Sequence, residues 1–87
     1  MTIHETSNFS KRIEKLTKRN PRLRQKIDKK LQLLVTDSGN NSLRLHKIGG
    51  REDSIWSISI DMKLRILLTY VEDGILLFDI GTHDEVY

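Results

Sequence analysis

Two histidines, an arginine and a tyrosine have side chains suited to chemistry at a phosphodiester: His46, Arg65, His83 and Tyr87. One imidazole can take the proton from a 2′-hydroxyl while another group protonates the leaving oxygen. An arginine can stabilise the charge that develops on the phosphorus oxygens, and a tyrosine ring can stack on a base. These residue types together suit metal-independent cleavage of RNA.

Each of these residues also has an ordinary structural reading. An isolated histidine is more often a surface or capping residue than a catalyst. Arg65 could pair with a carboxylate such as Asp61 or Glu72, and Tyr87 is the last residue, where chains commonly fray. Trp56 alternates with Ile58 and Ile60, so it is expected in the core rather than as a platform for bases. Spacing alone therefore leaves both readings open.

Other kinds of site have little support in the sequence. There is no cysteine, which excludes a disulfide framework and a thiolate metal site. The three histidines show no helical metal-ligand spacing, and Gly49-Gly50 lacks the Lys-Ser/Thr step of a phosphate loop. We therefore expect neither a metal nor a cofactor.

The first half of the chain has the periodicity of two helices. Phe9, Ile13 and Leu16 fall at i, i+4 and i+7, with Ser7 as the expected N-cap. Asn20-Pro21 should end this helix and begin the next, because proline fits the first helical position. Apolar residues of the second helix recur at helical spacing until turn formers at 37–41: Leu23, Ile27, Leu31 and Leu34.

The second half has the alternation of β-strands. Strands are predicted over 56–60, 64–71 and 75–80, with a tight hairpin at 72–74 and Gly81 as the end of the last strand. Residues 2–5 give a weak signal for an edge strand, and 42–55 read as a loop with a short strand. The prediction is a single α+β domain over 1–87, an N-terminal helical hairpin packed on a three- to four-stranded antiparallel sheet.

Such a meander should gather the candidate residues on one side of the sheet. Alternation places Arg65 on the face of Leu67 and Thr69, opposite Leu64, Ile66 and Leu68. His46 precedes the first clear strand, whereas His83 and Tyr87 follow the third. A chain of 87 residues leaves little room for a deep cavity, so a shallow surface cleft is expected.

The net charge of +3 conceals an asymmetry between the two halves. Residues 1–50 carry 12 Lys and Arg against 4 Asp and Glu, whereas 51–87 carry 3 against 8. A basic half favours a polyanion or an acidic protein as partner, although a solvated helix face is the simpler reading. The sequence has no apolar run long enough to span a bilayer and no signal-peptide pattern, so we expect a cytoplasmic protein without membrane contact.

Longer stretches of sequence carry a more specific signal. Residues 45–50 read Leu-His-Lys-Ile-Gly-Gly, and 81–87 read Gly-Thr-His-Asp-Glu-Val-Tyr. With the helix opening at 9–12, Asn20-Pro21 and the strands at 56–60 and 64–67, they span nearly the whole chain. In these segments the sequence resembles the RelE/ParE superfamily of bacterial type II toxins, most closely the RelE/YafQ-like mRNA interferases.

The resemblance implies a RelE-like microbial ribonuclease fold and a toxin that cuts messenger RNA in the ribosomal A site. Cleavage in this family needs no metal and proceeds by attack of the 2′-hydroxyl, leaving a cyclic phosphate. His46 and His83 match family histidines and are the expected proton-transfer pair, without an assignment of acid and base. Arg65 matches the strand arginine that neutralises the scissile phosphate, and Tyr87 matches the C-terminal aromatic residue.

The resemblance also implies partners. A cognate antitoxin should neutralise the protein, and the basic helix faces at 11–30 suit either that contact or ribosomal RNA. Three further cations are expected nearer the cleft, where they would bind the message: Lys47, Arg51 and Lys63.

The sequence departs from the family pattern at several positions. Ser57 and Ser59 stand where RelE-like members have lysines, so lysine-based activation of the 2′-hydroxyl is absent. Asp61 is out of register with the acidic residue of YafQ-like members, and Asp79 replaces an arginine. Two alternatives stay open: a ParE-like inhibitor of DNA gyrase, and a noncatalytic relic of the fold that binds antitoxin or RNA.

Overall fold

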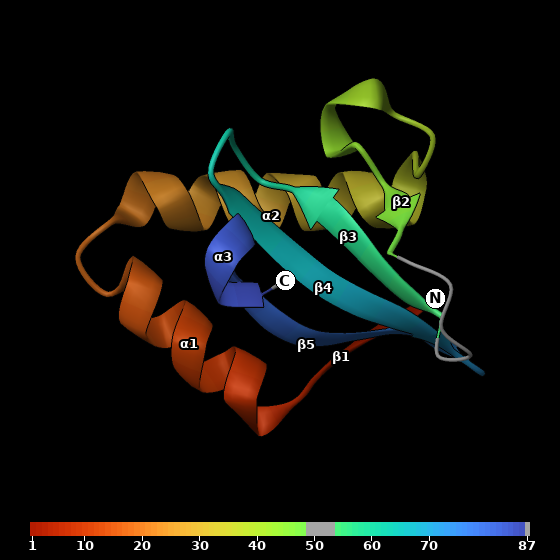
Figure 1. Cartoon of the computed structure of the whole chain (residues 1–87), viewed down its shortest axis with the longest axis horizontal. Helices are drawn as coiled ribbons and strands as arrows, with labels where there is room; N and C mark the ends of the chain where they lie inside the picture. The colour runs from red at the N-terminus through yellow and green to blue at the C-terminus, as the bar shows by residue number, and fades with distance from the viewer. Residues whose placement is uncertain (49–53, 87) are drawn as a thin grey trace.

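The computed structural model describes residues 1–48 and 54–86, so Arg51 and Tyr87 lie outside the described residues. Figure 1 shows a sheet with helices α1 and α2 beside it and the short helix α3 near the C-terminus. In chain order the elements are β1 (Thr2–Glu5), α1 (Ser7–Thr17), α2 (Pro21–Thr36), the 3-10 turn η1 (Asn41–Leu43), β2 (His46–Lys47), β3 (Ile55–Ser59), β4 (Leu64–Val71), β5 (Gly74–Thr82) and α3 (His83–Val86).

The sheet has the strand order β1-β5-β4-β3-β2. β2 to β5 form the predicted antiparallel meander, whereas β1 runs parallel to β5. The α+β class and the helices packed on a sheet are confirmed, but the sheet has five strands and is mixed. The extra strands are a four-residue and a two-residue edge strand, which are too short to show a clear alternation in sequence.

Both longer helices begin at side-chain caps. Thr6 Oγ1 accepts a hydrogen bond from the Phe9 N–H at 3.1 Å, so the cap of α1 is Thr6 and the prediction of Ser7 is wrong by one residue. Both residues offer a hydroxyl, which is why the sequence did not separate them. The predicted Asn20 cap of α2 is confirmed, since Asn20 Oδ1 accepts from the Leu23 N–H at 3.1 Å.

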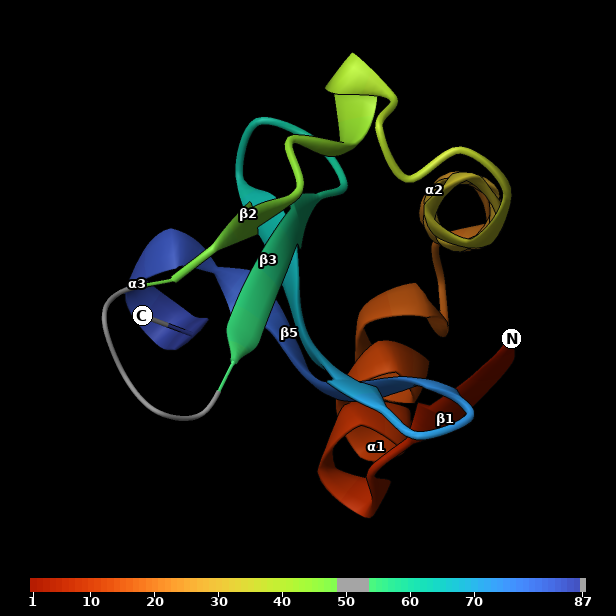
Figure 2. The same ribbon diagram turned by 90° about the vertical axis from the view of Figure 1, so that its right-hand side faces the viewer.

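Helices α1 and α2 cover one face of the sheet, and the core lies between these helices and the sheet (Figure 2). Trp56 is partly buried and packs against this core, as predicted. Its ring also contacts Tyr70 edge to face, with ring centroids 5.7 Å apart. The fully or nearly fully buried core residues come from both layers: Phe9, Ile13, Ile27, Leu34, Leu43, Ile58, Ile60, Leu64, Ile66, Leu68, Ile75, Leu77 and Ile80. Among the described helices, none is both long and apolar enough to cross a membrane.

Two turns fix the register of the sheet. In the β3–β4 turn, Asp61 Oδ1 accepts the N–H groups of Lys63 and Leu64, each at 2.8 Å. The β4–β5 turn comes at Glu72-Asp73, as predicted. β5 continues through Gly81 to Thr82, so the prediction that Gly81 ends the strand is wrong. Glycine is a common strand terminator, but here its missing side chain makes room for neighbouring groups.

Candidate functional site

The face of the sheet that points away from α1 and α2, called here the outer face, carries the candidate residues. His46 is paired with Ser57, and Ser59 is paired with Arg65. Paired residues project to the same side, opposite to their chain neighbours Ile58 and Ile66 in the core. His46 and Arg65 therefore share the outer face, as the sequence predicted.

The short helix α3 brings His83 to the same face. Figure 2 shows α3 on the side of the sheet opposite α1 and α2. It packs on Gly81, where an added Cβ would come within 3.1 Å of Glu85 Cβ and Val86 Cγ1. A pocket of about 330 Å³ joins the first residue of α3 to β4; its lining is Met62, Lys63, Arg65, Thr82, His83 and Asp84. Arg65, His83 and Lys63 thus line one pocket.

His46 lies at the far side of the outer face. In the sheet its strand is three strand spacings, about 14 Å, from β5. Its Nδ1 lies 2.8 Å from the carbonyl oxygen of Arg44. A carbonyl oxygen accepts, so Nδ1–H is the donor in this hydrogen bond, which orients the ring and leaves Nε2 free of the proton in the neutral imidazole. The strand of His46 and the strand that leads into His83 are therefore separated by β3 and β4.

The two described lysines expected to bind RNA, Lys47 and Lys63, lie in different parts of the structure. Lys63 lines the pocket of Arg65 and His83. Lys47 is paired with Trp56, so it projects from the sheet edge on the side of the helices, away from His46. Arg51 and Tyr87, the other expected site residues, lie outside the described residues.

Arg12 of α1 anchors the end of β5 and the helix that carries His83. β1 pairs only with residues Gly74 to Leu77 of β5, so the strand edge beyond them has no strand partner among the described residues. Arg12 Nε donates to the Ile80 carbonyl oxygen at 2.7 Å and lies 3.2 Å from Asp79 Oδ1. Its Nη2 donates to Glu85 Oε2 at 3.2 Å. Asp79, a departure from the family pattern, thus has a structural partner.

Glu85 closes this network within α3. Its Oε1 accepts the Thr82 N–H at 2.9 Å, and this hydrogen bond together with the Arg12 cation holds the pKa of Glu85 below its ordinary value. The carboxylate therefore stays ionised and fixes the turn from β5 into α3. The position of His83 depends on this turn. Sequence reasoning missed Arg12, because nothing local distinguishes it from the other cations of a basic helix.

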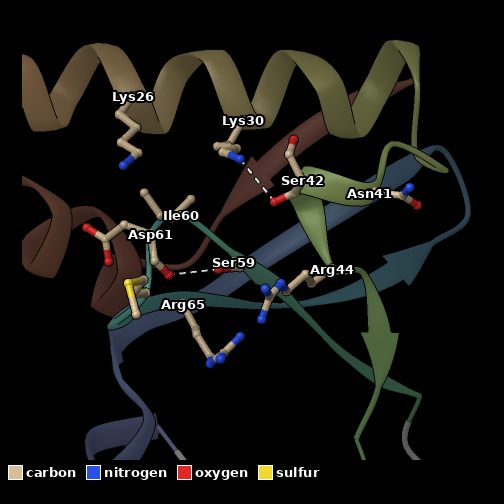
Figure 3. A pocket seen from close by; sticks show the side chains of 10 residues that line it. Lys26, Lys30, Asn41, Ser42, Arg44, Ser59, Ile60, Asp61 and Arg65 are labelled. Atoms are coloured by element: carbon tan, nitrogen blue, oxygen red, sulfur yellow. Dashed lines mark hydrogen bonds between the residues drawn. The ribbon is translucent and has the colours of Figure 1, made fainter.

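A second cleft adjoins Arg65 on the side of α2 (Figure 3). Its volume is about 580 Å³, and it lies between α2, η1 and the β3–β4 turn. Figure 3 shows the side chains of Arg44 and Arg65 extending into the same space, with Lys26 and Lys30 above them on α2. Within residues 1–48 and 54–86, neither the Arg44 nor the Arg65 side chain has a carboxylate or hydrogen-bond partner. The alternative of an Arg65 ion pair with Asp61 or Glu72 is therefore absent there.

Arg44 follows η1 with a φ of 48° and a ψ of 43°, in the left-handed region. A non-glycine residue in this region costs free energy, commonly about 1–2 kcal/mol. The strained backbone turns the chain from η1 into β2, and the Arg44 carbonyl oxygen meets His46. Sequence reasoning missed Arg44, and the only signal was the run of turn formers just before it.

Asp61 is the carboxylate at this cleft. Partial burial opposes its ionisation, but the N–H groups of Leu64 and Lys63 and the cation of Lys26 prevail and lower its pKa. A carboxylate of lowered pKa that caps a turn is a poor proton acceptor. Asp61 therefore caps the β3–β4 turn. The sequence did not predict a catalytic role for it.

The fold is that of known bacterial toxins. The toxin of the E. coli DinJ–YafQ toxin–antitoxin complex superposes with a TM-score of 0.80 at 15% identity, covering 99% of this chain and 96% of that one. The YoeB–YefM complex from Staphylococcus aureus gives 0.78 at 14% identity, with 95% and 97% covered. A metal-bound toxin from Helicobacter pylori gives 0.78 at 18% identity, with 100% and 99% covered.

These similarities show the fold that the resemblance predicted. No protein-family model matches the sequence, and no curated protein matches it either. The part of the chain that the structure describes contains no group of three or more His, Cys, Asp or Glu residues that could hold a metal ion.

Proposed function

We propose that this protein is the toxin of a type II toxin–antitoxin system and that it cleaves messenger RNA on the ribosome without a metal. The observation that carries this proposal is that Arg65 and His83 line the same pocket of the outer face. Arg65 has no carboxylate partner among the described residues, so its charge is available to a phosphate. The fold shared with YafQ and YoeB toxins supports the same assignment.

The chemistry follows from the two side chains. The 2′-oxygen of the message attacks the adjacent phosphorus, and the bond from phosphorus to the 5′-oxygen breaks as the cyclic phosphate forms. One group takes the 2′-hydroxyl proton and another protonates the 5′-oxygen; His83 and His46 are the proposed pair. Arg65 neutralises the charge on the non-bridging oxygens. Because β3 and β4 separate the strand of His46 from the strand that leads into His83, the RNA would lie between the two histidines.

A cognate antitoxin is the proposed protein partner, as in the DinJ–YafQ and YoeB–YefM complexes. Residues 11–30 carry the basic helix faces that suit an acidic segment of such a partner. The rival function, inhibition of DNA gyrase by a ParE-like toxin, would leave His46 and His83 without a role. A noncatalytic relic of the fold would keep only the binding of antitoxin or RNA.

Primer extension on messages from cells that express the chain tests the proposal. We expect fresh message ends with the wild type and their loss in H83A and R65A. H4A is the matched control, because His4 is also an exposed histidine but pairs with Asp73 at the opposite end of the sheet. H4A should cut as the wild type does.

Other outcomes separate the rivals. Growth arrest with intact messages and blocked DNA supercoiling would reject the nuclease in favour of gyrase inhibition. A wild type without effect on messages or growth would reject both and leave the relic. Equal cutting by H83A and wild type would reject the assigned role of His83.

A further inference from the structure

A basic groove continues from Arg65 along α2. The cleft beside Arg65 adjoins a second one of about 630 Å³, and the two share Lys26, Lys30 and Ser42. We call the joined surface the α2 groove; its defining residues are Arg22, Lys26, Lys29, Lys30, Ser42 and Arg44. Arg65 lies at the end of this groove nearest to His83.

The cations of the groove are regularly spaced. Arg22, Lys26 and Lys30 lie at i, i+4 and i+8 of α2, so they form one ridge with a step of about 6 Å. Lys30 Nζ donates to the Ser42 carbonyl oxygen at 3.0 Å, which joins α2 to η1 across the groove. Of the described lining residues, Asp61 is the carboxylate, and its Oδ1 is engaged in the β3–β4 turn. The ridge therefore presents a row of positive charge to whatever enters.

The remaining lining favours a phosphodiester backbone over a protein segment. The hydroxyl and amide groups of Asn41, Ser42 and Ser59 accompany the cations, and such groups commonly bind phosphate and sugar. An amphipathic helix would need apolar anchors at helical spacing. The α2 groove has few apolar lining residues: Ile60 is 1% exposed, Met62 is exposed on the β3–β4 turn, and Leu33 lines the second cleft.

We propose that the α2 groove binds the backbone of the single-stranded RNA that flanks the bond held at Arg65 and His83. This inference rests on the proposed function, since it extends the same substrate beyond the reacting phosphate. Arg44 stands where the groove meets the pocket, and Figure 3 shows its side chain next to that of Arg65.

Direct binding tests the groove without relying on cleavage. The probe is a fluorescent mixed-sequence RNA of about 12 nucleotides with 2′-O-methyl groups throughout, which removes the attacking hydroxyl. The variant is K26E/K30E, and the matched comparator is K11E/K15E, which makes the same charge change at the same spacing on α1. We expect K26E/K30E to bind about tenfold more weakly than the comparator, and its salt slope to shrink by about 1.4 for two lost phosphate contacts.

Two further measurements distinguish a loss of RNA contacts from a folding defect of the double variant. K26E alone, compared with K15E, leaves the Lys30 bridge to Ser42 intact and should show about half of the lost salt slope. A 2′-O-methyl trinucleotide, too short to fill the groove, should bind both double variants equally.

Equal affinity of K26E/K30E and K11E/K15E for the longer RNA would overturn the groove proposal and leave the α2 surface to an acidic protein partner. Equal weakening for the trinucleotide and the longer RNA would also overturn it, because the loss would then come from the pocket. A wild type that binds the probe through the groove but leaves messages intact would reject the nuclease and keep the groove.

Discussion

Arg12 and Arg65 are both neighbours of Gly81, but their side chains have different surroundings. Arg12 reaches around the edge of β5, where its Nη2 lies 2.8 Å from the position that a Gly81 Cβ would take. It is bound by a carbonyl oxygen and two carboxylates. Arg65 is the register partner of Gly81 on β4 and has no such partner among the described residues. Arg12 therefore stabilises the protein, whereas the Arg65 side chain is available to the phosphate that we propose it binds.

The largest effect expected from this comparison is on activity. R65M should reduce RNA cleavage by between about 100- and 1000-fold, because a preorganised donor at the phosphate is lost. Its melting temperature should stay that of the wild type, since the described structure gives Arg65 no internal partner. Cleavage assays and thermal unfolding check the two halves of the prediction. A marked fall in melting temperature would show that Arg65 is a structural residue.

The same substitution at Arg12 should act on stability. R12M should lower the free energy of unfolding by about 1.5–3 kcal/mol, because charged hydrogen bonds are lost and the Ile80 carbonyl is left without its donor. Cleavage should also fall at temperatures where the variant is folded, because α3 loses the Glu85 contact that positions His83. Urea unfolding and cleavage at low temperature measure both. A variant as stable as the wild type would contradict the anchoring role.

A methyl group at Gly81 tests the close packing of Arg12 and α3 on β5. G81A should cost about 1 kcal/mol, since the flexible end of Arg12 can shift but Glu85 and Val86 are 3.1 Å from the new Cβ. Amide hydrogen exchange should show weaker protection of α3 than in the wild type. Unchanged stability and protection would mean that α3 does not need this close approach.

The smallest expected effect concerns pH. The pKa of Glu85 is lowered from its ordinary value of 4.5, so its contribution to stability is present above that pH and is lost as pH falls through the folded-state pKa. E85Q keeps an acceptor for the Thr82 N–H but removes the charge. The wild type should therefore be more stable than E85Q at neutral pH, and the difference should close on acidification. Urea unfolding at a series of pH values checks this, and a constant difference would contradict it.

Local patterns predicted most of the fold. Asn20-Pro21 marked the start of α2, and Glu72-Asp73 marked the β4–β5 turn, because capping and turn chemistry depend on neighbouring residues. The parallel pairing of β1 was not predicted, since its partner β5 is distant in sequence. The role of Gly81 was not predicted either. Its missing side chain leaves room for Arg12 and α3, and these neighbours are distant in sequence or follow the strand, so local patterns do not indicate them.

The candidate site was predicted in part for the same reason. Strand alternation placed Arg65 and His46 on one face, and the meander brought His83 to Arg65. Alternation does not specify how far apart the strands of His46 and His83 lie, and this distance depends on the strand order. Arg44 was missed because its role depends on a left-handed backbone that sequence rules assign to glycine or asparagine.

The central claim is that Arg65, unlike Arg12, serves a phosphate of RNA. The most direct test is a transcriptome-wide map of 2′,3′-cyclic phosphate ends in cells that express the wild type or R65M at equal levels. The account predicts new cyclic phosphate ends within messages for the wild type and none above background for R65M. Equal ends with both proteins, or intact messages in cells arrested by the wild type, would contradict it.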